Sequence, residues 1–175
     1  VLFLHGPHGC GKKSTMHILA KECGYKVIRF VSEEDLYGEM TMADSLYSVY
    51  LTHSERDTPC LVMLYDIDSW MYRGEDGLLN VNPRLGQMET YIQKMRNATK
   101  KNFRMVLLCD DMSLLPCRTM AKYCLSVAFY PPSESRMDDL LRGLTKKGIK
   151  IPPSMRIVIK NNCCGNLRQL GIILD

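Results

Sequence analysis

Short apolar runs alternate with stretches of helical spacing along the first 130 residues. Five runs have the length and composition of buried strands: Val1–Leu4, Lys26–Val31, Cys60–Tyr65, Phe103–Cys109 and Leu125–Phe129. Between them, apolar residues recur at helical spacing over Ser14–Cys23, Met42–Glu55 and Arg84–Lys100. Strands separated by helices are typical of βαβ units, which build a parallel sheet covered by helices on both faces. The pattern therefore predicts an α/β fold with a parallel five-stranded sheet sandwiched by helices.

The pattern changes after residue 130. Two prolines at positions 131 and 132 interrupt the alternation, and Ser133 has the position of an N-cap for a helix that runs to about Lys147. Gly148 is placed to end that helix. Two further helices are expected over Ser154–Asn162 and Asn166–Leu174. We therefore predict a core domain over residues 1–130 and a small helical lid over residues 131–175. The stretch Tyr72–Pro83 is expected to be an exposed loop.

Composition narrows the class of protein. The chain has 175 residues, of which 46% are hydrophobic and 24% charged, so it is a globular protein and not a disordered one. No apolar run approaches the ~20 residues of a membrane-spanning helix, and the opening residues are too short for a signal peptide. Eight scattered cysteines without a C-x-x-C pair favour a reducing compartment, the cytosol or nucleus. The net charge of +4 is compatible with a polyanionic partner without establishing one. Because the chain begins within a strand and without methionine, we expect it to be a piece of a longer protein.

A glycine-rich turn carries the most specific chemical signal. It follows the first apolar run, opens the first helix and reads Gly6-Pro7-His8-Gly9-Cys10-Gly11-Lys12-Lys13-Ser14. The glycines allow successive backbone N–H groups to point at phosphate oxygens, and the helix adds the positive end of its dipole. Lys12 places a cation near the β- and γ-phosphates. The turn therefore predicts a phosphate-binding loop for a nucleotide.

One position departs from the usual pattern of such a loop. The residue after the loop lysine is normally Ser or Thr, whose hydroxyl binds Mg²⁺, and here it is Lys13. Ser14 has a hydroxyl, but one further residue turns it by about 100° around the helix. Lys13 cannot coordinate a metal, although it can neutralise phosphate charge. Nucleotide binding is therefore better supported than hydrolysis.

A second candidate lies at the end of the third strand. Asp66 and Asp68 follow a buried run, where a nucleotide-hydrolysing enzyme needs a carboxylate near Mg²⁺ or the attacking water. Many such enzymes carry Asp-Glu-x-Asp here. If Asp66 is the first acid, Ile67 replaces the glutamate; if Asp68 is the last acid, Tyr65 replaces the metal ligand. One acid is missing in either alignment, and a purely structural role in capping a loop is also open.

These motifs together resemble a known family. The phosphate loop, the acidic third strand and the ending Cys164-Gly165-Asn166-Leu167-Arg168-Gln169-Leu170 look like the AAA+ ATPases of clamp loaders, the replication factor C family and its checkpoint relative. The ending is similar to the family signature Gly-Asp-Leu-Arg-x-Ala-Leu. The phrase Lys147-Gly148-Ile149-Lys150-Ile151-Pro152 is similar to the segment between the first and second lid helices. The similarity spans nearly the whole chain.

The resemblance implies roles for particular residues. Lys12 and the backbone of Gly9–Lys13 would bind the phosphates of ATP, and Asp66, less surely Asp68, would act around Mg²⁺. Arg168 would be the lid arginine that senses the nucleotide. Asp110 would occupy the polar position at the end of the fourth strand.

The resemblance also implies partners. These are other AAA+ subunits in a hetero-oligomeric ring, a sliding clamp and DNA, in the nucleus and in replication, DNA damage signalling or repair, and no membrane. The triplet Lys122-Tyr123-Cys124 stands where small subunits carry Ser-Arg-Cys, and Arg118 is out of register. This subunit is therefore not expected to donate an arginine finger to a neighbour. The family's adenine-gripping N-terminal segment and its C-terminal collar are not in this sequence.

Three functions remain open at this point. The chain can be an active clamp-loader ATPase, a nucleotide-binding scaffold subunit that does not hydrolyse ATP, or a small P-loop kinase. Lys13 and Ile67 favour the scaffold over the motor. A kinase lid would bring several arginines together on the phosphates, whereas the tail offers Arg136, Arg142, Arg156 and Arg168 without clear convergence.

Overall fold

The computed structural model describes residues 1–30, 46, 48–52, 58–73, 79–81, 92–93 and 103–174. The chain forms two compact units. The sheet unit comprises Val1–His5 and Lys13–Ala128, and the lid unit comprises Gly6–Lys12 and Phe129–Asp175. Most of the helix expected over Arg84–Lys100 lies outside the described residues, and Ile92 and Gln93 within it are helical.

All five predicted strands are present within one residue of their expected ends. They are β1 (Leu2–His5), β2 (Lys26–Phe30), β3 (Cys60–Leu64), β6 (Phe103–Cys109) and β7 (Leu125–Ala128). Their order in the sheet is β2-β3-β6-β1-β7, and every neighbouring pair is parallel. Because parallel strands end at one common edge, the residues that follow β1, β3 and β6 begin at the same edge of the sheet.

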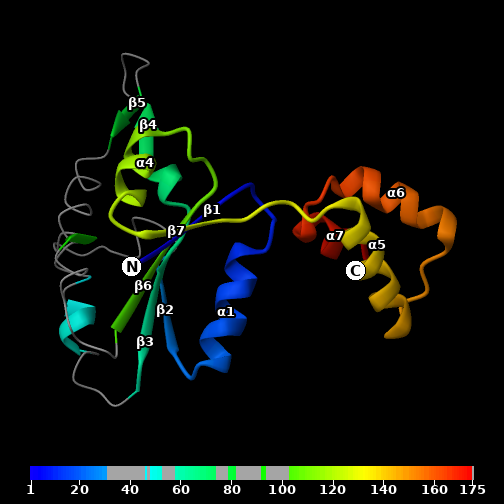
Figure 1. The fold of residues 1–175 in the computed structure, drawn as a ribbon, viewed down its shortest axis with the longest axis horizontal. Helices are drawn as coiled ribbons and strands as arrows, with labels where there is room; N and C mark the ends of the chain where they lie inside the picture. The colour runs from blue at the N-terminus through cyan, green and yellow to red at the C-terminus, as the bar shows by residue number, and fades with distance from the viewer. Residues whose placement is uncertain are drawn as a thin grey trace. The chain divides into compact units, whose positions relative to one another are not determined.

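The two faces of this sheet are both buried, as expected for a parallel sheet. One face carries Phe3, Val62, Leu64 and Leu107, which pack in one cluster with Cys117 and Met120 of α4 (Leu115–Ala121). The other face carries the buried Leu4, Leu61, Met63, Val106 and Leu108. Met16 and Ala20 of α1 (Lys12–Glu22) are buried as well. Figure 1 shows α1 along one side of the sheet and α4 along the other. This is a three-layer α/β sandwich, so the predicted fold class is confirmed.

The expectation of an exposed loop over Tyr72–Pro83 is wrong for the described part of that stretch. A short 3₁₀ helix η2 (Ile67–Trp70) leads into β4 (Met71–Arg73), which pairs antiparallel with β5 (Leu79–Val81). Strands of three residues are too short to give a periodic signal, and backbone pairing satisfies the groups that a loop would leave to water.

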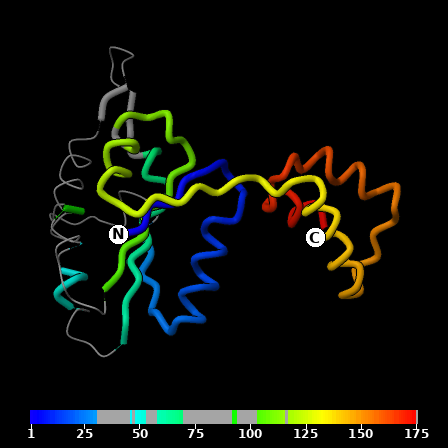
Figure 2. The backbone as a smooth tube through the Cα atoms, in the orientation of Figure 1, coloured from blue at the N-terminus to red at the C-terminus, as the bar shows by residue number. Residues whose placement is uncertain are grey.

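The lid unit holds three helices in sequence: α5 (Glu134–Lys146), α6 (Pro153–Cys163) and α7 (Leu167–Leu174). Figure 2 follows the chain through them from yellow to red. They pack around a small core made of Met137, Leu141, Ile151, Ile159, Cys163 and Leu170. The expected helices are confirmed, and Gly148 has the positive φ of 101° that suits glycine after a helix end.

Replacing Ser133 with alanine is expected to lower the free energy of unfolding of the lid unit by about 1 kcal/mol. The Ser133 hydroxyl accepts a hydrogen bond from the Arg136 backbone N–H at 3.4 Å and so caps α5. Urea unfolding followed by circular dichroism measures the change. Ser135→Ala is the matched control, because Ser135 is the second residue of the same helix. Equal losses from the two substitutions would show that the hydroxyl cap contributes nothing.

Candidate functional site

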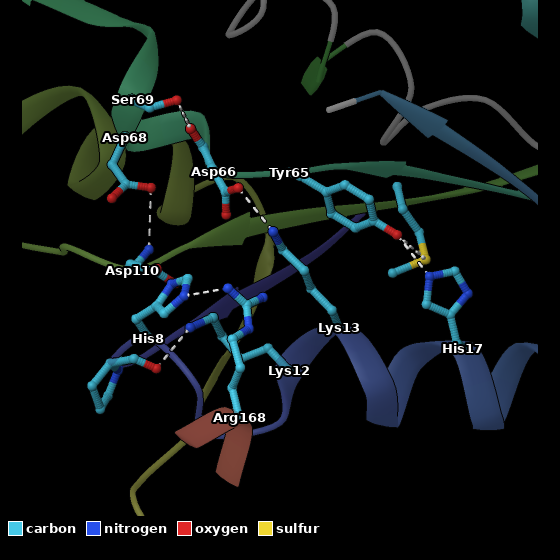
Figure 3. A network of polar contacts seen from close by, with 12 residues as sticks. His8, Lys12, Lys13, His17, Tyr65, Asp66, Asp68, Ser69, Asp110 and Arg168 are labelled. Carbon is cyan, nitrogen blue, oxygen red and sulfur yellow. Dashed lines mark hydrogen bonds and ion pairs between the residues drawn. The ribbon is translucent and has the colours of Figure 1, made fainter. Parts of the chain in front are cut away.

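The turn between β1 and α1 is built around a buried lysine. Lys12, the first residue of α1, is only 4% exposed. Its Nζ atom donates to the carbonyl oxygens of Gly6 and of Pro7, the second at 3.1 Å (Figure 3). Burying an ammonium group is costly unless acceptors surround it, and these two carbonyl oxygens are among the acceptors of Lys12. A phosphate group would supply full negative charge at the same atom.

The beginning of α7 contacts this loop directly. The backbone N–H of Leu167 donates to the carbonyl oxygen of Gly9 at 2.9 Å. Gly9 has φ +78°, and a Cβ built on it would lie 1.9 Å from Oδ1 of Asn166. That same Oδ1 accepts from the backbone N–H groups of Arg168 and Gln169, at 3.0 and 3.1 Å, and thereby caps α7. Glycine is therefore required at position 9 by both its backbone conformation and the close approach of the lid.

The arginine expected to sense nucleotide reaches the loop. Nη1 of Arg168 lies 2.6 Å from Nε2 of His8, although 160 positions separate the two residues in sequence (Figure 3). Because a guanidinium group only donates, Nε2 of His8 is the acceptor in this contact. Both side chains are exposed, so the guanidinium remains accessible to an anion bound at the loop.

The acidic turn after β3 holds Asp66 in an uncommon conformation. Asp66 has φ +51°, in the left-handed region that aspartate tolerates better than most residues. Its carbonyl oxygen accepts from the backbone N–H of Ser69 at 2.8 Å and from the Ser69 hydroxyl at 2.6 Å. These two bonds fix the turn and thus the direction of the Asp66 carboxylate.

Lys13 pairs with that carboxylate. Its Nζ atom lies 2.8 Å from Oδ2 of Asp66 and 4.7 Å from the centre of the Tyr65 ring (Figure 3). The Tyr65 hydroxyl in turn lies 2.7 Å from Nε2 of His17, one helical turn after Lys13. Burial raises the pKa of Tyr65, so its hydroxyl stays protonated near neutral pH. Our sequence analysis did not single out Tyr65 and His17 for this role; the four-residue spacing of Lys13 and His17 on one helix face was the available signal.

The Asp68 carboxylate binds backbone N–H groups at the end of the neighbouring strand β6. Its Oδ1 accepts from the backbone N–H of Asp110 at 3.1 Å, and its Oδ2 accepts from that of Asp111 at 3.2 Å. Asp68 therefore closes the turn that follows β6, and it brings the two predicted positions Asp68 and Asp110 together. These contacts are the ones expected if Asp68 caps a loop.

The remaining candidate positions differ in burial and in backbone conformation. Ile67, which replaces the glutamate if Asp66 is the first acid, is fully buried in the core cluster of the sheet unit. Cys10 is buried in the loop, whereas Pro7, His8 and Ser14 are exposed. Gly6 and Gly11 have positive φ values of 143° and 97°. The Ile67 side chain thus supplies no base for an attacking water.

The donor set fits a chain of phosphates and does not fit Mg²⁺. The loop offers a buried ammonium group, glycine-rich backbone and the beginning of α1, which together are suited to phosphate oxygens. At the metal position, a cation would meet the ammonium group of Lys13 in place of a hydroxyl. The residues present at this position therefore do not fit Mg²⁺.

Other arginines are engaged elsewhere. Arg142 contacts Asp139 at 3.3 Å on its own helix, and Arg156 donates to the Thr145 hydroxyl at 3.5 Å. Arg118 donates to the carbonyl oxygens of residues 112 and 113 at 3.0 and 2.7 Å. Among the lid arginines, Arg142 and Arg156 thus contact residues of the lid helices, and Arg168 contacts the loop.

The parallel sheet, with a phosphate-binding loop between its first strand and first helix, defines a P-loop nucleotide-binding fold. Residues 2–131 match the model of the ATPase family associated with various cellular activities (AAA). The chain belongs to this family.

Curated relatives include proteins of chromosome maintenance. Chromosome transmission fidelity protein 18 of Saccharomyces cerevisiae is 22% identical over 200 aligned positions, which cover all of this chain and 26% of the relative. Replication factor C subunit 1 of the same yeast is 23% identical over 98% of this chain and 20% of the relative. The chain thus spans about a quarter or less of these proteins.

A solved structure shares the fold. The Aeropyrum pernix Orc1 protein, solved in complex with DNA, superposes with a TM-score of 0.58 at 13% identity, over 97% of this chain and 51% of that one. At this identity the likeness establishes the fold alone. In the described part of the chain, every helix is too short or too polar to cross a bilayer.

Proposed function

We propose that this chain is the ATP-binding AAA subunit of a complex that loads a DNA sliding clamp, acting in the nucleus in replication or in the response to DNA damage. The similarity to chromosome transmission fidelity protein 18 and replication factor C subunit 1 along the length of the chain supports this proposal. Other AAA subunits in a hetero-oligomeric ring, the clamp and DNA are the proposed partners. Residues 1–130 would work as the ATPase core and residues 131–175 as its lid.

One observation carries the proposal of ATP binding. Lys12 is a buried cation whose described acceptors include loop carbonyl groups, directly at the start of a helix. A phosphate chain would bring its negative charge to this ammonium group, and the backbone of Gly9–Lys13 would offer N–H donors. Arg168 would reach the same anion from the lid, because it already contacts His8 of the loop.

Hydrolysis is the weaker part of the proposed activity. Asp66, the candidate metal ligand, is paired with Lys13, and Asp68 accepts two backbone N–H groups. Ile67 is buried where a catalytic glutamate would be needed. These contacts favour a second candidate, a scaffold subunit that binds ATP and orders the ring without turning it over. In both versions, Arg168 of α7 would contact the ATP bound at the loop.

The test measures binding and chemistry separately. We expect isothermal titration to detect ATP binding, and single-turnover assays with radiolabelled ATP to give slow or no release of phosphate. Co-expression with clamp-loader small subunits should give a complex whose yield increases with ATP. Absence of ATP binding would refute the proposal, and transfer of label to a small acceptor would identify a kinase instead.

Arg168→Ala is expected to weaken ATP binding by about tenfold, because one charge-assisted contact to phosphate is lost. Fluorescence titration with a labelled ATP analogue measures this change. Arg142→Ala removes another exposed lid arginine, whose described contacts lie within α5, and it should leave the affinity unchanged. Equal effects of both substitutions would assign the loss to lid charge in general and contradict a specific role for Arg168.

A further inference from the structure

Lys13, the residue that follows the phosphate-loop lysine, forms an unusual ion pair. Lys13 lies on the first turn of α1, and its Nζ atom is 2.8 Å from Oδ2 of Asp66 at the end of β3. Both groups belong to the sheet unit. When Asp66 is aligned as the first acid, these two positions are those that supply the hydroxyl and the carboxylate around Mg²⁺ in P-loop proteins. Here they neutralise each other.

The pair is held from several sides. The ring of Tyr65 lies under the ammonium group of Lys13. The Tyr65 hydroxyl forms a hydrogen bond with His17, which lies in α1 like Lys13. The backbone of Asp66 is fixed by Ser69, so the carboxylate is directed towards α1. The side chains of Lys13 and Asp66 are 31% and 34% exposed, so the ion pair is partly shielded from water.

Charge decides between this pair and a metal ion. A divalent cation at the Asp66 carboxylate would lie beside a fixed ammonium group and would have to displace it. Mg²⁺ also needs near-ideal octahedral coordination and loses its waters reluctantly. The second nearby carboxylate, Asp68, has both oxygens accepting backbone N–H groups. The Asp66 carboxylate is therefore paired with the fixed ammonium group of Lys13 in place of an exchangeable metal ion.

We propose that the Lys13–Asp66 ion pair replaces Mg²⁺ in this chain, so that it binds ATP without a divalent cation. This inference rests on the proposed function, because it concerns the same nucleotide. It adds that the metal-free nucleotide is a ligand of the site and that Lys13 determines this preference. The loop lysine and the backbone N–H groups then carry the interaction with the phosphates.

The experiment compares the affinity for ATPγS in excess EDTA and in excess MgCl₂, by calorimetry, so that no turnover is needed. The wild-type chain should bind with dissociation constants that agree within about twofold. Lys13→Thr restores a hydroxyl and frees Asp66, so its binding should weaken by about tenfold or more when Mg²⁺ is removed. Lys13→Thr combined with Asp66→Asn should lose this new dependence, because the carboxylate ligand is gone. Lys21→Thr, which removes a charge from the last turn of the same helix, should behave as wild type.

The outcomes separate the two proposals. Wild-type binding that requires MgCl₂ overturns the inference and leaves the proposed function standing. Binding by the wild type in neither buffer overturns the proposed function, and the inference with it. Loss of binding by Lys13→Thr in both buffers would show that Lys13 itself holds the phosphates, and this too contradicts the inference. Circular dichroism confirms that each variant is folded.

Discussion

ATP binding is expected to fall by about a hundredfold when Lys12 is replaced with alanine. Lys12 is 4% exposed and contacts the carbonyl groups of Gly6 and Pro7, so it is a pre-positioned cation that needs little ordering when phosphate arrives. Charge-assisted contacts of this kind are the strong ones, and the effect is enlarged because the site is shielded from water. Fluorescence titration with a labelled ATP analogue measures the change.

The control for this substitution removes the same charge from the same helix. Lys21→Ala lies in the last turn of α1 and should leave ATP affinity within about twofold of wild type. Circular dichroism should show both variants folded, because each substitution truncates one side chain of α1. An unchanged affinity in folded Lys12→Ala would remove the physical basis of the proposed site.

Gly9→Ala is expected to destabilise the lid unit by about 2 kcal/mol and to weaken ATP binding as well. The backbone conformation at φ +78° accounts for about 1 kcal/mol of this loss. The new Cβ would also displace Asn166, which caps α7 through the backbone N–H groups of residues 168 and 169, and this costs about 1 kcal/mol more. Urea unfolding and ATP titration measure the two effects.

A double-mutant cycle isolates the clash from the strain. Asn166→Ala alone should cost about 1 kcal/mol, and the double variant should cost less than the sum of the singles, because the collision is gone. Gly148→Ala is the matched control in the same unit: its φ is +101°, and nothing lies within 4 Å of the built Cβ. If the losses of the two single variants sum to the loss of the double variant, the beginning of α7 does not pack against Gly9.

The fold followed from the sequence because its signals are local. The strands of a parallel sheet are buried on both faces, so each is a short continuous apolar run, and all five were predicted within one residue of their ends. The start of α5 was predicted because the capping hydroxyl of Ser133 is a property of a few neighbouring residues. The pair β4 and β5 was missed, because three-residue strands depend on each other and carry no periodic pattern. Helix α4, of seven residues, has no side-chain cap that would mark its start.

The candidate site was predicted only as a set of residues. The glycine-rich turn and the two acids are contiguous in sequence, so their presence was evident. The sequence also established that Lys13 cannot bind a metal, because that depends on the chemistry of one side chain. Phosphate was the anion expected for Lys13, and its partner in the structure is Asp66.

Tertiary structure decided the partners of these residues. Lys13 meets Asp66 across 53 positions because β3 lies two strands from β1 and both end at one edge of the sheet. Arg168 meets His8 across 160 positions because α7 begins against the loop at Gly9. Such contacts depend on the order of the strands and on packing between helices, which no local pattern encodes. The sequence by itself thus determined the strands, the loop and the missing hydroxyl, and only the folded chain showed that a lysine neutralises the candidate metal ligand.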